Sequence, residues 1–237
     1  MKNSVEADQC VCPETKGILY VVATPIGNLE DITLRAIRIL KEADFILCED
    51  KRQTVKLLNK YEIKSKLISF HKFNEEKIQN EVLSLLNSGK SLALVSDAGT
   101  PLISDPGSKL VLACHENKIK VISIPGSSSL TGALSVSGLD LKEFLFVGFL
   151  PGKKSKRKRL IASFKERSKN IVLFVGPHDF KKYINEIYEI FSDINVFYGR
   201  ELTKIHEESW FGNIKELISN LNEFKAKGEI IFCLQIV

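Results

Sequence analysis

The fold class of this chain is decided by residues 92–107, LALVSDAGTPLISDPG. Leu92–Ser96 is a short apolar run typical of a buried strand, and a loop rich in glycine and proline follows it directly. Asp105 and Pro106 then match a helix N-cap and its first-turn proline, so a helix is predicted from there to about Glu116. A strand, a loop and a helix in this order indicate an α/β protein.

The same alternation continues on both sides of this segment. In the first half, strands are predicted at Ile18–Ala23, Phe45–Cys48, Leu67–Phe70 and Val121–Ile124, and helices at Ile32–Glu42, Thr54–Lys60, Glu75–Leu86 and Ser127–Ser137. In the second half, strands are predicted at Phe144–Val147, Ile171–Val175, Ile194–Tyr198, Trp210–Phe211 and Ile230–Ile236, and helices at Ser155–Arg167, Phe180–Phe191 and Ile214–Phe224. This alternation predicts an α/β fold with mainly parallel sheets flanked by helices.

The length of 237 residues allows one large or two modest domains. We expect a flexible leader over residues 1–16, an N-terminal α/β domain over 17–139 and a C-terminal α/β domain over 140–237. The boundary falls where the Gly138–Glu143 stretch interrupts the pattern of strands and helices. No run approaches the roughly 18 apolar residues of a membrane span, so no membrane association is expected.

The cysteines indicate a reducing compartment. There are five of them, and they form neither a C-x-x-C pair nor a metal-ligand spacing: Cys10, Cys12, Cys48, Cys114 and Cys233. The last three lie in apolar segments, where a free thiol packs as a small hydrophobic group. We therefore expect structural thiols, no metal site and a cytoplasmic location.

The formal net charge of +5 is unevenly distributed along the chain. Residues 151–170 contain nine basic residues and one acidic residue, so the rest of the chain is net negative. A charge run is usually only the solvated face of a helix, but a local patch of this density is also typical of polyanion binding. The candidate phosphate ligands in this patch are Lys153, Lys154, Lys156, Arg157, Lys158 and Arg159.

Three loops rich in small residues follow predicted strands, at residues 23–29 (ATPIGNL), 96–107 and 125–129 (PGSSS). Ligands of open α/β sheets bind at the carboxyl ends of strands, where these loops lie. Asp97 and Asp105 supply acceptors, and neither G-x-x-x-x-G-K-[ST] nor G-x-G-x-x-G is present. The loops therefore favour a nucleoside with a cationic sulfonium over a polyphosphate or a dinucleotide. A tight strand-to-helix turn without a ligand is the alternative.

Several runs resemble the signature segments of one enzyme family: TPIGNLEDITLRAIRIL (24–40), SDAGTPLISDPG (96–107) and RELTK (200–204). The shorter runs EDKR (49–52), SFHKFNE (69–75) and GFLP (148–151) occur in the family's order. From about Gly17 onward the chain resembles the bacterial small-subunit ribosomal RNA cytidine-2′-O-methyltransferases of the tetrapyrrole-methylase superfamily. The resemblance implies two α/β domains, with the methyl donor S-adenosylmethionine in a cleft between them. It also implies a homodimer, with ribosomal RNA or the small ribosomal subunit as substrate.

By position, the resemblance also implies the residues of the donor site. They are Pro25, Gly27, Asp97, Ala98, Gly99, Thr100, Pro101, Ile103, Ser128 and Ser129. The expected reaction is methyl transfer to the ribose 2′-OH of a cytidine in 16S ribosomal RNA. The chain departs from the family pattern at residues 125–129, PGSSS in place of PGPSA, and at 175–179, VGPHD in place of an EAPHR-like run.

Five further residues are candidates for the chemistry. His71 is a candidate base, because histidine titrates near neutrality. Glu49 and Asp50 are candidates to orient a ribose or accept its proton, or to form a structural ion-pair network with Arg52. Lys204 is a candidate ligand for an RNA phosphate, with a structural ion pair as the alternative.

Two other functions stay open on the sequence alone. The shared fold permits a methylase of corrinoids or porphyrins, because a fold does not determine a substrate. The glutamate and arginine missing from the segment around Pro177 would also suit a non-catalytic RNA-binding assembly protein that retains the fold.

Overall fold

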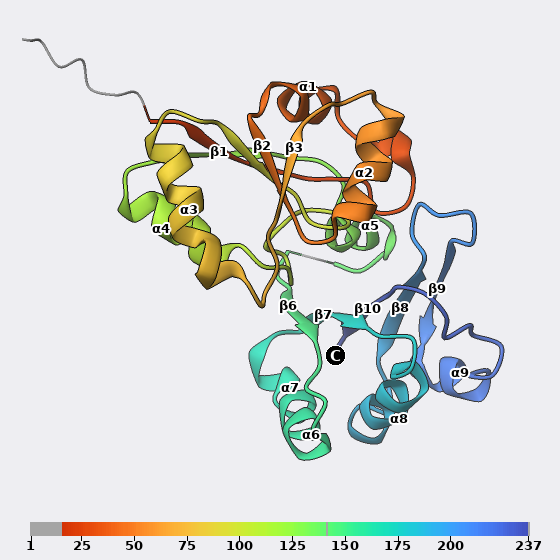
Figure 1. Cartoon of the computed structure of the whole chain (residues 1–237). Helices are drawn as coiled ribbons and strands as arrows, with labels where there is room; N and C mark the ends of the chain where they lie inside the picture. Colours follow the sequence, from red (N-terminus) through yellow and green to blue (C-terminus); the bar gives the residue numbers. More distant parts are fainter. Residues whose placement is uncertain (1–15, 141, 237) are drawn as a thin grey trace, which may run out of the picture. The chain divides into compact units, whose positions relative to one another are not determined.

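The computed structural model describes residues 16–140 and 142–236. The chain divides into two compact units (Figure 1). The first unit comprises the residues up to Ala23 together with Thr33–Pro125, and the second comprises Thr24–Ile32 together with Gly126 onward. The division is therefore not sequential, because the loop after the first strand belongs to the second unit. The expected leader, Lys16 excepted, lies outside the described residues, and the domain boundary after residue 139 stays a prediction.

The first unit contains a five-stranded parallel sheet. Its strands are β1 (Ile18–Val22), β2 (Phe45–Cys48), β3 (Lys66–Ser69), β4 (Leu92–Leu94) and β5 (Lys120–Ile124). They lie in the order β3-β2-β4-β1-β5, and every neighbouring pair is parallel. The buried patterns of β2 and β4 fit a sheet that is covered on both faces. The expected α/β class is confirmed.

Helices cover this sheet on both faces. They are α1 (Leu34–Glu42), α2 (Lys51–Lys60), α3 (Glu75–Asn87) and α4 (Ser108–Glu116). A short 3-10 helix, η1 (Leu29–Asp31), follows β1 and belongs to the second unit. Figure 1 draws α3 and α4 side by side, away from α1 and α2. Val82 and Leu86 of α3 and Leu110 of α4 are fully buried against the sheet residues Leu47 and Leu92. Each such side chain contributes roughly 1.5–3 kcal/mol through burial.

The second unit contains a mixed sheet, and here the expectation of mainly parallel strands is wrong. Its strands are β6 (Leu145–Phe149), β7 (Asn170–Val175), β8 (Asn195–Arg200), β9 (Glu208–Asn213) and β10 (Ile230–Gln235), in the order β6-β7-β10-β8-β9. Only β6 and β7 pair in parallel. The reason lies partly in the connection from β8 to β9, which has no helix and is too short for a parallel crossover.

Two helix layers cover the sheet of the second unit. The helices are α5 (Ser129–Val136), α6 (Lys154–Ala162), α7 (Phe164–Arg167), α8 (Phe180–Ile190) and α9 (Ile214–Ser219). One face packs against α6, α8 and α9 in a core that includes Ile161 and Ile184. The other face packs against α5 through Ala133, which contacts a cluster containing Phe197 and Cys233.

Some helix ends differ from the predictions. Helix α4 begins at Ser108 after Gly107, so Asp105 does not cap it. The chain turns first, because Leu102 and Ser104 adopt left-handed conformations with φ values of 71° and 73°. The basic helix predicted as one element is divided at Ser163, whose Oγ donates to the carbonyl of Leu160 (2.7 Å). Helix α9 begins at Ile214 as predicted, and Asn213 caps it by accepting from the backbone N–H of Lys215.

The cysteines within the described residues are free and buried, as expected for structural thiols: Cys48, Cys114 and Cys233. Burial raises the pKa of Cys114 to about 11 and that of Cys233 to about 12, so neither thiol is a ready nucleophile. Cys10 and Cys12 lie outside the described residues. No helix in the described part of the chain is both long and apolar enough to span a membrane.

Candidate functional site

The three loops expected to bind the donor start from neighbouring strands. Strand β1 lies between β4 and β5 in the first sheet, and all three run in the same direction. Their carboxyl ends therefore meet at one edge, and the carboxyl ends of β2 and β3 continue that edge. The topology thus gives the three loops a common origin, which the order of the segments in the sequence does not show.

The loop after β4 is compact. The Oγ of Ser96 lies within hydrogen-bonding distance of the carbonyl oxygens of Ala98 (3.2 Å) and Gly99 (3.4 Å), which curls the chain back toward the strand. Gly99 has a φ of 80°, a conformation that other residues rarely adopt. Gly107 closes the loop against β4, since a β-carbon there would lie 2.8 Å from Cδ2 of Leu94. Within this loop Pro101 is buried, whereas Asp97 and Ile103 are exposed.

Three carboxylates gather beside this loop, and we call them the acidic edge: Glu49, Asp97 and Asp105. Asp97 Oδ1 accepts from the backbone N–H of Asp50 (3.0 Å), which ties the ends of β2 and β4 together. Burial, reinforced by the charge of Asp97, raises the pKa of Glu49. Burial likewise raises the pKa of Asp105 to about 6, and the charges of Glu49 and Asp97 add to the effect. The acidic edge is therefore an environment that a cation would stabilise.

Asp50 and Arg52, two predicted site residues, form a local structural pair. Asp50 caps α2 by accepting from the backbone N–H of Arg52 (2.8 Å), and their side chains are 2.7 Å apart at Oδ2 and Nη2. Hydrogen bonds from Arg52 lower the pKa of Asp50 to about 2. Asp50 is consequently a weak proton acceptor at neutral pH.

His71 follows β3 at the same edge of the sheet. Its backbone N–H donates to Oδ1 of Asn74 (2.8 Å), and the Asn74 amide donates back to the carbonyl of Ser69 (2.9 Å). The Nδ1 of His71 is buried and has no hydrogen-bond partner among the described residues. No group there fixes the imidazole tautomer, in contrast to the usual arrangement of a catalytic histidine.

The other two loops lie together in the second unit. Ser127 Oγ donates to the carbonyl of Asp31 (3.1 Å), which joins the loop after β5 to the loop after β1. Pro25 of the latter loop is buried and Gly27 is exposed. Ser128 precedes the first turn of α5, but its side chain forms no capping bond there.

Lys204 has its charge already paired. Its Nζ lies 2.8 Å from Oε1 of Glu201 and 3.2 Å from Oε2 of Glu229, and its side chain is only 28% exposed. These contacts therefore support a structural ion pair for Lys204 and not the role of ligand for an RNA phosphate.

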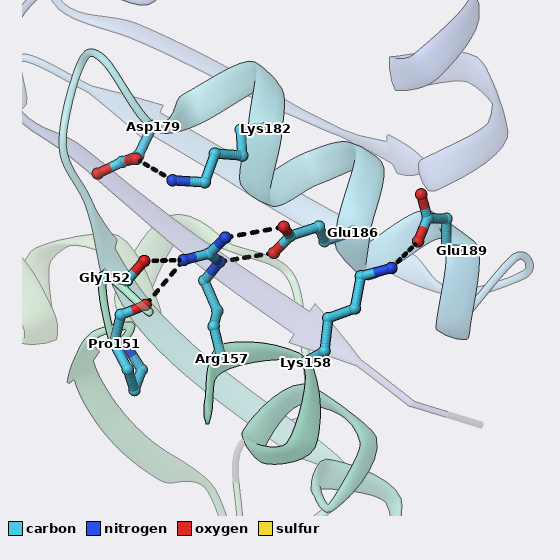
Figure 2. Close-up of polar contacts among 8 residues, drawn as sticks. All are labelled: Pro151, Gly152, Arg157, Lys158, Asp179, Lys182, Glu186 and Glu189. Atoms are coloured by element: carbon cyan, nitrogen blue, oxygen red, sulfur yellow. Dashed lines mark hydrogen bonds and ion pairs between the residues drawn. The ribbon is translucent and has the colours of Figure 1, made fainter. Parts of the chain in front are cut away.

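Arg157 is buried, which excludes the direct phosphate contact expected from the sequence. Figure 2 shows its guanidinium pointing toward Glu186 of α8, with Nε and Nη2 donating to the two carboxylate oxygens (2.6 and 2.8 Å). Its Nη1 donates to the carbonyls of Pro151 (2.9 Å) and Gly152 (2.7 Å), and its Cζ lies 4.9 Å from the centre of the Tyr183 ring. Arg157 thus fastens α6 and the preceding turn to α8.

The other cations of α6 are on the surface. Lys158 pairs with Glu189 of α8 (2.6 Å), so its charge is partly neutralised (Figure 2). The remaining four are exposed and form no ion pair within the described part of the chain; we call them the basic surface: Lys153, Lys154, Lys156 and Arg159.

The segment that departs from the family pattern contributes to the same region. Asp179 accepts from Nζ of Lys182 (2.9 Å), and the neighbouring charge of Arg157 also helps to lower its pKa. The replacement of the family's arginine by Asp179 therefore places a carboxylate beside the buried guanidinium.

The sequence reasoning did not place three participants in the site. Asp105 was named as an acceptor of the loop and as a helix cap, but it was not included among the donor-site residues. Thr203 and Glu186 had no local signal, because their partners lie far away in sequence. Within residues 16–140 and 142–236, no group of three or more His, Cys, Asp or Glu side chains is arranged to hold a metal ion.

Relatives of known name match nearly the whole chain. A protein of Thermotoga maritima named "Ribosomal RNA small subunit methyltransferase I" is 48% identical over 218 residues, which are 92% of this chain and 98% of the relative. A protein of the same name from Bacillus subtilis is 43% identical over 220 residues, which are 93% of this chain and 75% of the relative.

Solved structures share the fold. The uroporphyrin-III C-methyl transferase of Thermus thermophilus, solved in complex with S-adenyl homocysteine, has a TM-score of 0.64 at 20% identity and covers 92% of this chain and 97% of its own. A cobalt precorrin-4 methyltransferase has a TM-score of 0.65 at 18% identity, and covers 91% of this chain and 94% of its own. These likenesses concern the fold alone.

The resemblance seen in the sequence motifs is confirmed at the level of the family. The profile described as "Tetrapyrrole (Corrin/Porphyrin) Methylases" matches residues 18–218, which include β1 through most of α9. With this match and the identities of its relatives, the chain belongs to the tetrapyrrole methylase family and is a methyltransferase.

Proposed function

We propose that this chain transfers the methyl group of S-adenosylmethionine to the ribose 2′-OH of a cytidine in 16S ribosomal RNA. The observation that carries the proposal is the 48% identity to a ribosomal RNA small subunit methyltransferase across 98% of that relative's length. Identity at this level over a whole chain involves both units rather than one shared module.

The acidic edge fits the methyl donor by charge. When bound, S-adenosylmethionine supplies an electrophilic methyl group attached to a positively charged sulfur. The raised pKa values of Glu49 and Asp105 reflect carboxylates that are partly desolvated and that are repelled by neighbouring carboxylates, Asp97 among them. A cationic ligand nearby would relieve this repulsion, whereas a polyphosphate would increase it.

The donor-binding loops fit by size. The loops carry glycine, alanine or serine at several positions, and small side chains let a ligand approach the backbone closely. We assign donor contacts to Pro25, Gly27, Asp97, Ala98, Gly99, Thr100, Pro101, Ile103, Ser128 and Ser129. The common origin of the three loops at one edge of the first sheet supports this assignment.

Glu49 is the proton acceptor that we propose. Burial and the nearby charge of Asp97 raise its pKa, which makes it a stronger base than an ordinary carboxylate. Asp50, with a pKa of about 2, is the weaker base. Among the described residues no acceptor binds Nδ1 of His71, so none holds a proton there and leaves Nε2 as the base. The chain's part in the reaction is to align the ribose oxygen and to take its proton at the Glu49 carboxylate.

The basic surface is the RNA-binding element of the proposal. Its cations are Lys153, Lys154, Lys156 and Arg159, which are exposed and unpaired within the described part of the chain. They supply the sequence-independent part of the affinity, and base recognition and placement of the cytidine need other contacts. A corrinoid or porphyrin substrate has less use for such a surface, and the solved relatives with such substrates are only 18–21% identical.

We further propose that the enzyme acts in the cytoplasm as a homodimer, as the resemblance implies. Sedimentation equilibrium of the full chain tests the dimer, and a molecular mass of one chain at micromolar concentration contradicts it.

A map of ribose methylation on 16S ribosomal RNA tests the function. Cells that lack the protein should lose methylation at one cytidine, and the wild-type gene should restore it. The Glu49→Gln variant should restore it weakly, because a neutral amide accepts no proton. An identical methylation map in cells with and without the protein would refute the proposed substrate. Isothermal calorimetry with S-adenosylmethionine then separates an enzyme with another substrate from a non-catalytic protein.

A further inference from the structure

The loop after β1 rests on the turn formed by the RELTK run. The backbone N–H of Asn28 donates to Oγ1 of Thr203 (3.2 Å). Gly27 lies directly against Lys204: a β-carbon on Gly27 would be 2.3 Å from Cγ and 3.2 Å from Cδ of that lysine. It would also lie 3.1 Å from Oγ1 of Thr203. Thr203 and Lys204 are thus consecutive residues of one turn that contact this loop, and the contact leaves no room for a side chain at Gly27.

The turn is held independently of any ligand. Glu201 and Thr203 adopt left-handed conformations, with φ values of 50° and 68°. The backbone N–H of Glu201 donates to the carbonyl of Glu229 (2.9 Å), and the backbone N–H of Glu229 donates to Oε1 of Glu201 (2.9 Å). Gly228 lies beneath the Glu201 carboxylate, where a β-carbon would be 2.5 Å from Cδ. Contacts within the chain therefore fix the turn.

The same network fixes the stem of Lys204. Its backbone N–H donates to the carbonyl of Glu201 (3.0 Å), and its Nζ is paired with Glu201 and Glu229 (2.8 and 3.2 Å). A lysine held at both ends has lost the freedom of its long side chain. The aliphatic part of Lys204 consequently presents a fixed surface, and its charge is not available to a phosphate.

We infer that Thr203 and Lys204 are positioning residues for methyl-donor binding, acting through Asn28 and Gly27, and that the RELTK run does not contact the RNA. The inference rests on the proposed function, in which the loop after β1 contacts S-adenosylmethionine. On this inference, position 27 must be glycine because the Lys204 side chain packs directly against it, and not only because the ligand approaches it.

Two pairs of variants separate this role from RNA binding. Gly27→Ala should weaken the affinity for S-adenosylmethionine about tenfold or more, because the methyl group displaces the loop from Lys204. In the background of Lys204→Ala, which removes the obstructing stem, the same change at Gly27 should cost at most about a third as much. Thr203→Val should weaken donor affinity by about threefold or more through loss of the acceptor, whereas Thr203→Ser should retain it.

Isothermal calorimetry measures the affinity of each variant for S-adenosylmethionine. Binding of a 16S ribosomal RNA fragment at several salt concentrations measures the affinity for RNA. RNA affinity and its salt slope should stay within twofold in all variants. Lys215→Ala is the matched control, because Lys215 also forms an ion pair, with Asp193, but does not touch the loop. Thermal unfolding of each variant confirms that the fold is retained.

The opposite result is equally specific. If Lys204→Ala lowers RNA affinity and its salt slope by about one while donor affinity is unchanged, Lys204 is a phosphate ligand and the inference is wrong. Additive effects of Gly27→Ala and Lys204→Ala would also overturn it. If the wild-type chain itself fails to bind S-adenosylmethionine at millimolar concentration, the proposed function fails first, and the inference with it.

Discussion

The acidic edge of the first unit and the basic surface of the second both gather charges of one sign, but they differ in solvation. Glu49, Asp97 and Asp105 crowd around a compact loop, and burial together with mutual repulsion raises the pKa values of Glu49 and Asp105. The four cations of the basic surface project into solvent from α6 and the turn before it. Like charges therefore interact strongly in the first region and are screened in the second.

This difference shows which kind of charge cluster indicates a bound ligand. Exposed lysines cost little folding free energy, so the basic surface indicates only an attraction for polyanions. Half-buried carboxylates destabilise the fold unless something compensates them, so the acidic edge indicates a bound cation more specifically. Helix α6 contains both a buried charge and solvated charges close together. Arg157 is buried and paired, whereas Lys156 and Arg159 are exposed to solvent.

The largest effect is expected from breaking the buried pair on α6. Arg157→Met should lower the free energy of unfolding by about 3–5 kcal/mol, because Glu186 would keep a buried charge without a partner. Urea denaturation measures the loss. The double variant Arg157→Met/Glu186→Leu should recover most of it, since an apolar pair of similar volume removes both charges. A loss below about 1 kcal/mol in the single variant would show that the pair is not buried.

The basic surface should control RNA affinity rather than stability. Replacing Lys153, Lys154, Lys156 and Arg159 together with alanine should lower the log–log salt slope of RNA binding by about 3, at roughly 0.7–0.9 per phosphate contact. Affinity for S-adenosylmethionine should not change. Filter binding at several salt concentrations measures the slope.

A matched control has the same change in net charge. Replacing Lys41, Lys60, Lys64 and Lys77 of the first unit with alanine removes four exposed cations elsewhere. An equal fall in slope for both quadruple variants would show that net charge, and not this surface, attracts the RNA.

The acidic edge should make stability depend on pH. Asp105 has a pKa of about 6 in the folded chain against an ordinary value of 3.8, so the folded state binds a proton that the unfolded state has lost between these values. The free energy of unfolding should therefore fall as the pH rises from about 4 to about 6. After allowance for solvent screening, the fall is on the order of 1–2 kcal/mol.

Urea denaturation of Asp105→Asn at several pH values checks this dependence, and the variant should lack most of the fall. Asp193→Asn should leave it in place, because hydrogen bonds from Lys215 and Asn213 lower the pKa of Asp193. A wild-type fall that persists in Asp105→Asn would assign it to another group.

The smallest effect is expected from the exposed pair beside Arg157. Lys158→Met should change the free energy of unfolding by less than about 1 kcal/mol, because both Lys158 and Glu189 are solvated (39% and 57% exposed). Denaturation in the same urea series measures it. A loss as large as that of Arg157→Met would remove the distinction between the inner and outer sides of α6.

Most of the fold followed from local patterns in the sequence. Short β-branched runs and their spacing predicted every strand of the first sheet to within two residues at each end. The parallel arrangement there follows from helices between successive strands, which a sequence displays directly. The mixed arrangement of the second sheet could not be predicted in this way, because it depends on which strands become neighbours in the fold. The sequence around Ile230–Gln235 does not indicate that this strand lies between β7 and β8.

The candidate site was less accessible to sequence reasoning. The glycine-rich loops could be located because they follow strands, but the raised pKa of Asp105 depends on neighbours contributed by β2 and β4. Arg157 was misread because a run of cations conceals the helix period. Residues 160, 161 and 164 are apolar, and their spacing from 157 places that residue on the buried stripe. This signal was present, but the partner Glu186 was not predictable.

The position of β10 has a consequence for how the chain is made. This strand is hydrogen-bonded along both sides, yet it follows every other strand of its sheet in the sequence. During synthesis the first sheet, complete by Ile124, can form while the edges of β7 and β8 still lack the strand that separates them. Until β10 emerges from the ribosome, those edges can recruit other strands, so the nascent second unit is the part most exposed to misassembly.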